Sequence, residues 1–219
     1  MITNPVIAWL FAIMVQVAPP ERLAAQPQIP GHEETAEEKR VRYESIATDL
    51  YTTVYDPAVT PLFRGSKGRA MTAVLELAVA FHEGGFAHDV DKGPCYQGKG
   101  FRGRCDGGLA ACLMQIELGD GTTKEGWSKA DLFADRQKCF RAGLSVIRRS
   151  MSSCRKLPPQ LQLGVYAQGS CTSPVGQRKS RELYGQFRQF VAKADLPGPD
   201  ESMMPSQLGD GHPLAANER

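Results

Sequence analysis

Hydrophobic residues recur at the spacing of an α-helix in several stretches of the chain. Between Arg40 and Asp56 they fall three and four positions apart, which places them on one face of an amphipathic helix. A second helix is expected after Ser66, whose hydroxyl can cap it, and it ends at Gly84 and Gly85. The apolar residues of this second helix cover most of its circumference, so we expect it to be deeply buried.

Three further helices are expected in the second half of the chain. Asp135 can cap the first of them, which carries apolar residues on one side and arginines largely on the other. A shorter helix opens at Pro158 and Pro159 and runs toward Tyr166. The last helix runs from about residue 176 to residue 193, with three large apolar residues facing inward: Leu183, Phe187 and Phe190.

Glycines, charges and two cysteines dominate between Gly84 and Gly108, which predicts a long loop or a small irregular hairpin. The expected fold class is therefore α+β and mainly helical. Residues 26–38 are expected to form a linker, residues 39–194 a single domain and residues 195–219 a disordered tail.

An apolar run from Val6 to Ala18, broken only by Gln16, precedes the linker. It has the length of a signal-peptide core and is too short to span a bilayer comfortably. No Lys or Arg precedes the run, however, and cleavage after Ala18 or Ala25 would use a poor small-residue pattern. Residues 1–25 are therefore either an export signal or an N-terminal hydrophobic helix that stays in the mature protein.

Six cysteines lie between positions 95 and 171, and an even number in one region is typical of a disulfide set. Disulfides persist in oxidising compartments, which predicts a secreted or periplasmic protein. Zinc sites need closely spaced pairs such as C-x2-C, whereas the nearest cysteines here are seven positions apart. The pairs that we expect are Cys95 with Cys105, Cys112 with Cys139, and Cys154 with Cys171.

Composition places the chain among globular proteins, because 42% of its 219 residues are hydrophobic and 23% are charged. The net charge of +2 is unevenly distributed. Between Arg136 and Lys193 there are twelve Lys or Arg residues against one acid, Glu182. A basic surface of this kind favours an anionic polymer such as the bacterial wall or a nucleic acid, and the charge alone does not choose between them.

Glu83 ends the nearly all-apolar second helix, and two glycines that would let a substrate approach the backbone follow it. Desolvation and the negative end of the helix dipole would both raise its carboxyl pKa. A general acid needs a carboxyl that stays protonated near neutral pH. The alternative is an exposed glutamate at a helix end.

Two later segments add to this pattern, namely G-L-A-A-C-L-M-Q-I at residues 108–116 and L-G-V-Y-A-Q-G at residues 163–169. A glutamate that ends a buried helix, then a G-L-M-Q-I-like segment and an A-Y-N-x-G-like segment, resembles soluble lytic transglycosylases and goose-type lysozymes. The likeness covers roughly residues 70–191 and implies a lysozyme-like fold. It further implies that Glu83 is the catalytic acid, that Met114 and Gln115 line a glycan groove, and that Tyr166 holds the glutamate from the opposite wall. We also expect Gln168 to bind substrate.

The chain departs from the family pattern at three places. Transglycosylases usually have a serine after the glutamate and an asparagine after the tyrosine, whereas this chain has Gly84, then Ala167 and Gln168. Cys112 stands in place of the glycine before L-M-Q-I. These changes keep the catalytic acid but replace residues that would orient the substrate. Met114 and Tyr166 are alternatively buried core residues.

Cleavage of a glycosidic bond usually needs a second carboxylate to stabilise or trap the oxocarbenium-like centre. Glu117 follows L-M-Q-I where goose-type lysozymes carry an aspartate, so it is the candidate for activating a water; otherwise it is a surface acid. Asp106 is a weaker candidate for the second carboxylate, because it lies beside Cys105 and two glycines as a turn residue would. Lytic transglycosylases, by the same resemblance, lack this group and let the muramyl hydroxyl attack.

Three other motifs fit their usual functions poorly. The G-x-G-x-x-G at residues 98–103 has no apolar strand before it and no helix pattern after it. His82 and Glu83 followed by His88 depart from H-E-x-x-H, because the second histidine comes too late and beyond two glycines. Cys112 with His88 could form a nucleophilic pair, but a thiol in an oxidising compartment is expected to be bonded.

The sequence thus predicts a monomeric peptidoglycan glycosidase or lytic transglycosylase. We expect no metal or organic cofactor, no nucleic-acid partner and no stable membrane span. The alternative is a non-catalytic wall-binding or virion structural protein that keeps the fold.

Overall fold

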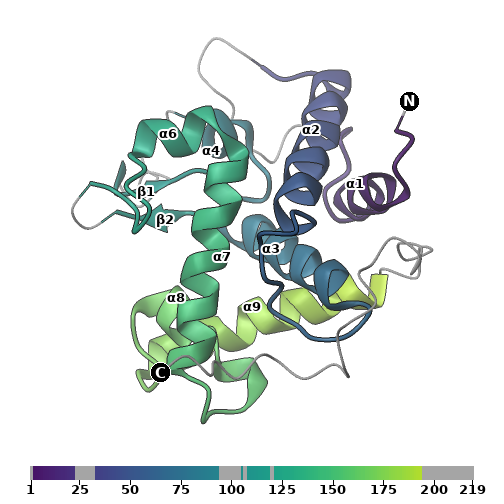
Figure 1. The fold of residues 1–219 in the computed structure, drawn as a ribbon. Helices are drawn as coiled ribbons and strands as arrows, with labels where there is room; N and C mark the ends of the chain where they lie inside the picture. Colours follow the sequence, from purple (N-terminus) through teal and green to yellow (C-terminus); the bar gives the residue numbers. More distant parts are fainter. Residues whose placement is uncertain (1, 23–32, 94–104, 106–107, 119–120, 194–219) are drawn as a thin grey trace. The chain divides into compact units, whose positions relative to one another are not determined.

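Figure 1 shows the computed structural model of the chain, which describes residues 2–22, 33–93, 105, 108–118 and 121–193. The described residues are mainly helical with one small antiparallel sheet, as the sequence predicts. The longer helices are α1 (Pro5–Val17), α2 (Ala36–Val54), α3 (Gly68–Gly84), α7 (Arg136–Ser153) and α9 (Pro174–Lys193). The shorter elements are α4 (His88–Lys92), β1 (Ala110–Ala111), β2 (Ile116–Glu117), α6 (Lys129–Ala134), the 3-10 helix η2 (Pro159–Leu161) and α8 (Gly164–Gln168).

Backbone contacts divide the chain into two compact units. Unit 1 comprises Met1–Thr53 and Ala80–Gly143, and unit 2 comprises Val54–Val79 and Leu144–Arg219. The boundaries fall within α3, within α7 and before the last residue of α2, so each of these helices contributes residues to both units.

The helices α2 and α7 begin at side-chain caps. Thr35 and Glu38 form a reciprocal pair: Oε2 of Glu38 accepts the Thr35 N–H at 2.8 Å, and Oγ1 of Thr35 accepts the Glu38 N–H at 3.2 Å. This capping box starts α2 at Ala36, four residues earlier than the hydrophobic pattern predicts, so residues 36–38 belong to a helix and not to the expected linker. Asp135 caps α7 as predicted, since its Oδ1 accepts the N–H groups of the second and third helical residues at 2.9 and 3.2 Å.

A short hairpin of unit 1 carries the L-M-Q-I segment. Ala110 pairs with Glu117, and Ala111 with Ile116. The disulfide Cys112–Cys139, which spans 27 positions in sequence, ties the turn of this hairpin to α7 and confirms one predicted pair.

Unit 2 contains the buried centre of α3 and the inner face of α9. Every residue of α3 from position 72 to position 79 is buried, which agrees with the expected deep burial. Leu183, Phe187 and Phe190 of α9 are buried as predicted, and the Phe187 ring stacks on Phe63 with the centroids 5.7 Å apart. Arg69 donates to the carbonyl oxygens of Val54 and Asp56 and so satisfies the end of α2.

Several elements differ from the sequence-based expectation. The helix expected after Pro158 is two pieces, η2 and α8, and the region after Gly84 contains α4, which has only five residues. The short helix α6 was not expected; Ser128 and Asp131 form its capping box. Cys95, Asp106, the G-x-G-x-x-G motif and the tail from residue 194 lie outside the described residues, so the predictions for them stay predictions.

The apolar run near the N-terminus forms α1, and five of its side chains are buried: Val6, Trp9, Leu10, Ile13 and Met14. Among the described helices, none combines the length and the apolar character that crossing a membrane requires.

Candidate active site

Glu83 is the last residue but one of α3 and is half-buried in unit 1. Gly84 follows it, and a Cβ built at Gly84 would come within 2.9 Å of Cγ1 of Val90. Any side chain at position 84 would therefore require Val90 to move, which favours glycine there. Next come Gly85 and Phe86 with φ values of +61° and +55°, a left-handed turn that ends the helix.

A pocket of about 420 Å³ opens beside Glu83. It is lined by the end of α3 together with Lys39 of α2 and residues of the chain that follows α1, among them Pro19 and Arg22. Glu21, next to Arg22, forms an ion pair with Arg40, which links this segment to α2. The lining of the pocket thus includes residues of the N-terminal 25.

Lys39 brings a positive charge to this pocket. Its side chain is buried, and its Nζ lies 5.7 Å from the ring centroid of Tyr43. Burial lowers the pKa of Lys39, and the neighbouring charge of Arg42 lowers it further, while Glu34 and Glu21 act in the opposite direction. The sequence pattern did not single out Lys39, because its position in α2 gives no sign of burial.

The hairpin of β1 and β2 holds three of the predicted site residues in unit 1, two in its turn and one in β2. Gln115 has a φ of +44°, and its side-chain amide donates to the Cys112 carbonyl at 2.8 Å. Glu117 is exposed in β2. Met114 is fully buried and packs against Gly143 of α7, so its burial favours the alternative interpretation as a core residue over contact with a glycan.

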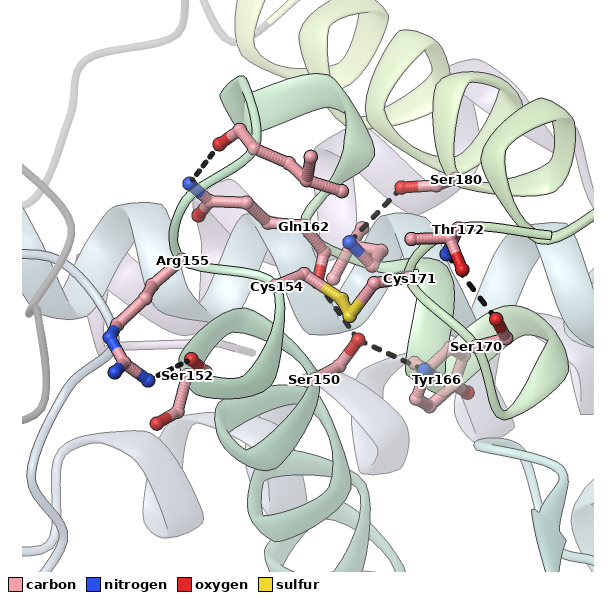
Figure 2. Close-up of a disulfide and its surroundings, with 12 residues drawn as sticks. Ser150, Ser152, Cys154, Arg155, Gln162, Tyr166, Ser170, Cys171, Thr172 and Ser180 are labelled. Carbon is pink, nitrogen blue, oxygen red and sulfur yellow. Dashed lines mark hydrogen bonds between the residues drawn. A yellow bond between two sulfur atoms is a disulfide. The ribbon is translucent and has the colours of Figure 1, made fainter. Parts of the chain in front are cut away.

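Tyr166 and Gln168 lie in α8 of unit 2, and Figure 2 shows the surroundings of Tyr166. The Tyr166 N–H donates to Oγ of Ser150 at 2.9 Å, and this hydroxyl donates in turn to the Gln162 carbonyl at 2.8 Å. The disulfide Cys154–Cys171, a second predicted pair that is confirmed, closes the loop that contains α8. Tyr166 is half-buried and Gln168 is exposed.

The structure therefore groups the predicted site residues by unit. Glu83, Gln115 and Glu117 belong to unit 1, and of these three only Glu83 is among the described residues that line the pocket. Tyr166 and Gln168 belong to unit 2, where the serine and disulfide contacts hold their segment.

Glu76 is a buried acid that the sequence analysis did not use. It lies in the unit 2 part of α3, is fully buried, and neither of its carboxylate oxygens has a hydrogen-bond partner in the structure. Burial raises the pKa of Glu76 well above its ordinary value, and the charge of Arg148 opposes this only in part. Glu76 could have been identified from the sequence as the single acid inside the apolar run of residues 70–81.

Within the described ranges no group of three or more His, Cys, Asp or Glu side chains could hold a metal ion. His82 is exposed at the end of α3, and His88 opens a separate helix, α4, beyond the left-handed turn. Comparisons of the chain with protein-family models, with curated protein sequences and with solved structures gave no match.

Proposed function

We propose that this chain cleaves the glycan strand of peptidoglycan at the β-1,4 bond between N-acetylmuramic acid and N-acetylglucosamine, with Glu83 as the general acid. The observation that carries the proposal is the position of Glu83, half-buried at the end of an apolar helix and lining a pocket of about 420 Å³ beside Gly84 and Gly85. The sequence order of Glu83, the L-M-Q-I segment and the Tyr166 segment supports the choice of substrate.

In this mechanism the Glu83 carboxyl donates its proton to the glycosidic oxygen while the bond to the muramyl C1 breaks. The proton moves to the leaving hydroxyl, and Glu83 becomes a carboxylate. The muramyl C6 hydroxyl then attacks C1, and its proton returns to Glu83, which yields a 1,6-anhydro end. No second carboxylate is needed for this route, and Glu83 is the one carboxyl group among the described residues that line the pocket.

The disulfides Cys112–Cys139 and Cys154–Cys171 support action in an oxidising compartment, where peptidoglycan is found. They do not depend on the catalytic proposal. A secreted or periplasmic location follows from them as a further part of the proposal.

The test is the release of soluble fragments from purified peptidoglycan at pH 4 to 8, followed by mass spectrometry of the products. Glu83→Gln keeps the shape of the side chain but cannot donate the proton, so activity should fall by about 10²–10⁴-fold. Glu125→Gln, at an exposed glutamate of the same unit, is the matched control and should keep wild-type activity. Full activity in a folded Glu83→Gln protein would refute the assignment.

A second candidate function is wall binding without catalysis. Unit 2 exposes many basic side chains and carries one exposed acid among the described residues of α7 and α9, Glu182. Among the described residues, the exposed basic residues of this unit are Arg64, Lys67, Arg148, Arg149, Arg155, Lys156, Arg178, Lys179, Arg181 and Arg188. Exposed charges are screened within about 8–10 Å at 0.1–0.15 M salt, so wall binding through them should weaken as salt rises. If wild-type protein sediments with walls in this salt-dependent manner but releases no fragment, binding is the function.

A further inference from the structure

The turn that follows Glu83 has a left-handed backbone at two successive residues, Gly85 and Phe86. Glycine adopts this conformation readily, whereas a residue with a side chain does so only at a cost in free energy. The Phe86 side chain is fully buried, and its ring meets the Tyr43 ring edge-on with the centroids 5.7 Å apart. A strained residue of this kind persists where the surrounding structure holds it.

Arg42 of α2 supplies one such contact. Its Nη1 donates to the carbonyl oxygen of Phe86 at 2.9 Å. On its other edge Nε and Nη2 donate to the two carboxylate oxygens of Glu34 at 2.5 and 2.7 Å. Both side chains are buried, with exposed fractions of 5% and 3%. The carboxylate therefore fixes the guanidinium, and the guanidinium fixes the backbone of the turn.

A second ion pair supports the first. Asp91 of α4 is fully buried, with one carboxylate oxygen 3.7 Å from Nη1 of Arg42. Arg136 of α7 donates to both oxygens of Asp91, at 2.5 and 2.8 Å, and also to Asp49 of α2 at 3.0 Å. Burial alone would lower the pKa of Arg136, but hydrogen bonds and charge interactions with Asp91 and Asp49 outweigh it, so its pKa lies above the ordinary value. Ionised groups from α2, α4 and α7 of unit 1 are thus linked to the arginine that binds the turn.

We propose that Arg42 is a positioning residue for Glu83: it holds the Phe86 carbonyl and so fixes the left-handed turn that sets the direction of the Glu83 side chain in the pocket. Arg42 is not among the described residues that line the pocket, so it acts through the backbone. The proposal rests on the proposed function, in which Glu83 is the general acid. A misplacement of a catalytic group by about 1 Å can cost roughly 10²-fold in rate.

Arg42→Gln tests this role by removing the charge and the fork of donors. We expect kcat on soluble glycan fragments to fall at least tenfold with KM within twofold, because the turn orients the acid and leaves glycan binding unchanged. Arg42→Lys keeps a charge opposite Glu34 but cannot bind Glu34 and the Phe86 carbonyl in the same way. The kcat of this variant should therefore lie between those of the wild type and Arg42→Gln. Arg69→Gln is the matched control: Arg69 is another buried arginine that donates to backbone carbonyls, in unit 2, and its kcat should stay within twofold.

A measurement without substrate separates this proposal from the catalytic one. The Ala87 N–H donates to the Gly84 carbonyl at 3.0 Å, so its hydrogen exchange reports whether the turn is formed. Exchange of this amide should speed up at least tenfold in Arg42→Gln and not in Arg69→Gln. Wild-type kcat in a folded Arg42 variant, or unchanged exchange at Ala87, would overturn the proposal.

If Arg42→Gln does not fold, Arg42→Lys decides by the same two measurements. If the wild-type protein shows no lytic activity, the proposed function fails, and the positioning role fails with it. The exchange rates in that case still establish whether Arg42 holds the turn.

Discussion

Met114 occupies the space that a side chain at position 143 would need. A Cβ built on Gly143 would come within 2.6 Å of Cε and 3.1 Å of Cβ of Met114. Cys139 lies one helical turn before Gly143 on α7 and is bonded to Cys112, two residues before Met114. The hairpin turn therefore contacts α7 at two successive levels, and the contact at Gly143 depends on the absence of a side chain.

Gly143→Ala should lower the free energy of unfolding by about 1–3 kcal/mol, because the added methyl group must displace Met114 and the turn that carries Gln115. The control is Gly185→Ala in α9, where a Cβ meets nothing within 4 Å. That change should raise stability by about 0.5–1 kcal/mol, since alanine is the better helix former. Urea unfolding of both variants measures the difference, and equal effects would contradict the tight contact.

The disulfide Cys154–Cys171 should stabilise the segment around Tyr166. Replacing both cysteines by serine should lower the free energy of unfolding by about 2–4 kcal/mol, as expected for a loop of 17 positions. The Tyr166 amide, which donates to Ser150, should also exchange faster relative to the rest of the protein. The matched change at Cys112 and Cys139 should lower stability without this local effect at Tyr166.

Glu76 should make the stability of the protein depend on pH. Its pKa in the folded state is raised, so its contribution is complete below the ordinary pKa of about 4.5 and is lost as the pH rises through the raised value. Glu76→Gln should therefore match the wild type near pH 4 and be the more stable protein at pH 7. Each unit of pKa shift corresponds to ~1.4 kcal/mol.

Thermal unfolding from pH 4 to pH 8 checks this expectation. Glu182→Gln is the control, because Glu182 is exposed in α9 and its ion pair with Arg178 is 3.9 Å long. Exposed pairs contribute about 0–1 kcal/mol, so this variant should follow the wild-type curve. A Glu76→Gln curve parallel to that of the wild type would show that Glu76 does not titrate in this way.

Under the proposed function, Glu117→Gln distinguishes a lytic transglycosylase from a hydrolase. Glu117 is exposed in β2 and is not among the described residues that line the pocket beside Glu83. We expect the variant to keep most of its activity and the wild-type product to carry a 1,6-anhydro end, as in a lytic transglycosylase. Loss of most activity together with a reducing muramic end would instead indicate a hydrolase that activates water at Glu117.

The sequence determined the long helices, because their formation depends on periodic burial and on local caps. The apolar spacing predicted α2, α3, α7 and α9, and Asp135 predicted the start of α7. Two of the three expected cysteine pairs are confirmed, and the third includes Cys95, outside the described residues. The helices α4 and α6 were missed because five or six residues are too few to show a helical period.

The sequence also singled out Glu83, through its place at the end of an apolar run. It did not identify the groups around the turn that follows, because Arg42 and Phe86 are 44 positions apart and Arg136 and Asp91 are 45 apart. Spacing along the chain contains no information about such pairs.

Only the tertiary structure decided which polar and apolar residues are buried. Met114 belongs to the core because Gly143 leaves room for it, and the pKa of Glu76 is raised because packing removes water from its carboxyl group. Both properties arise from neighbours that the fold brings together, whereas a helix forms from the residues within it.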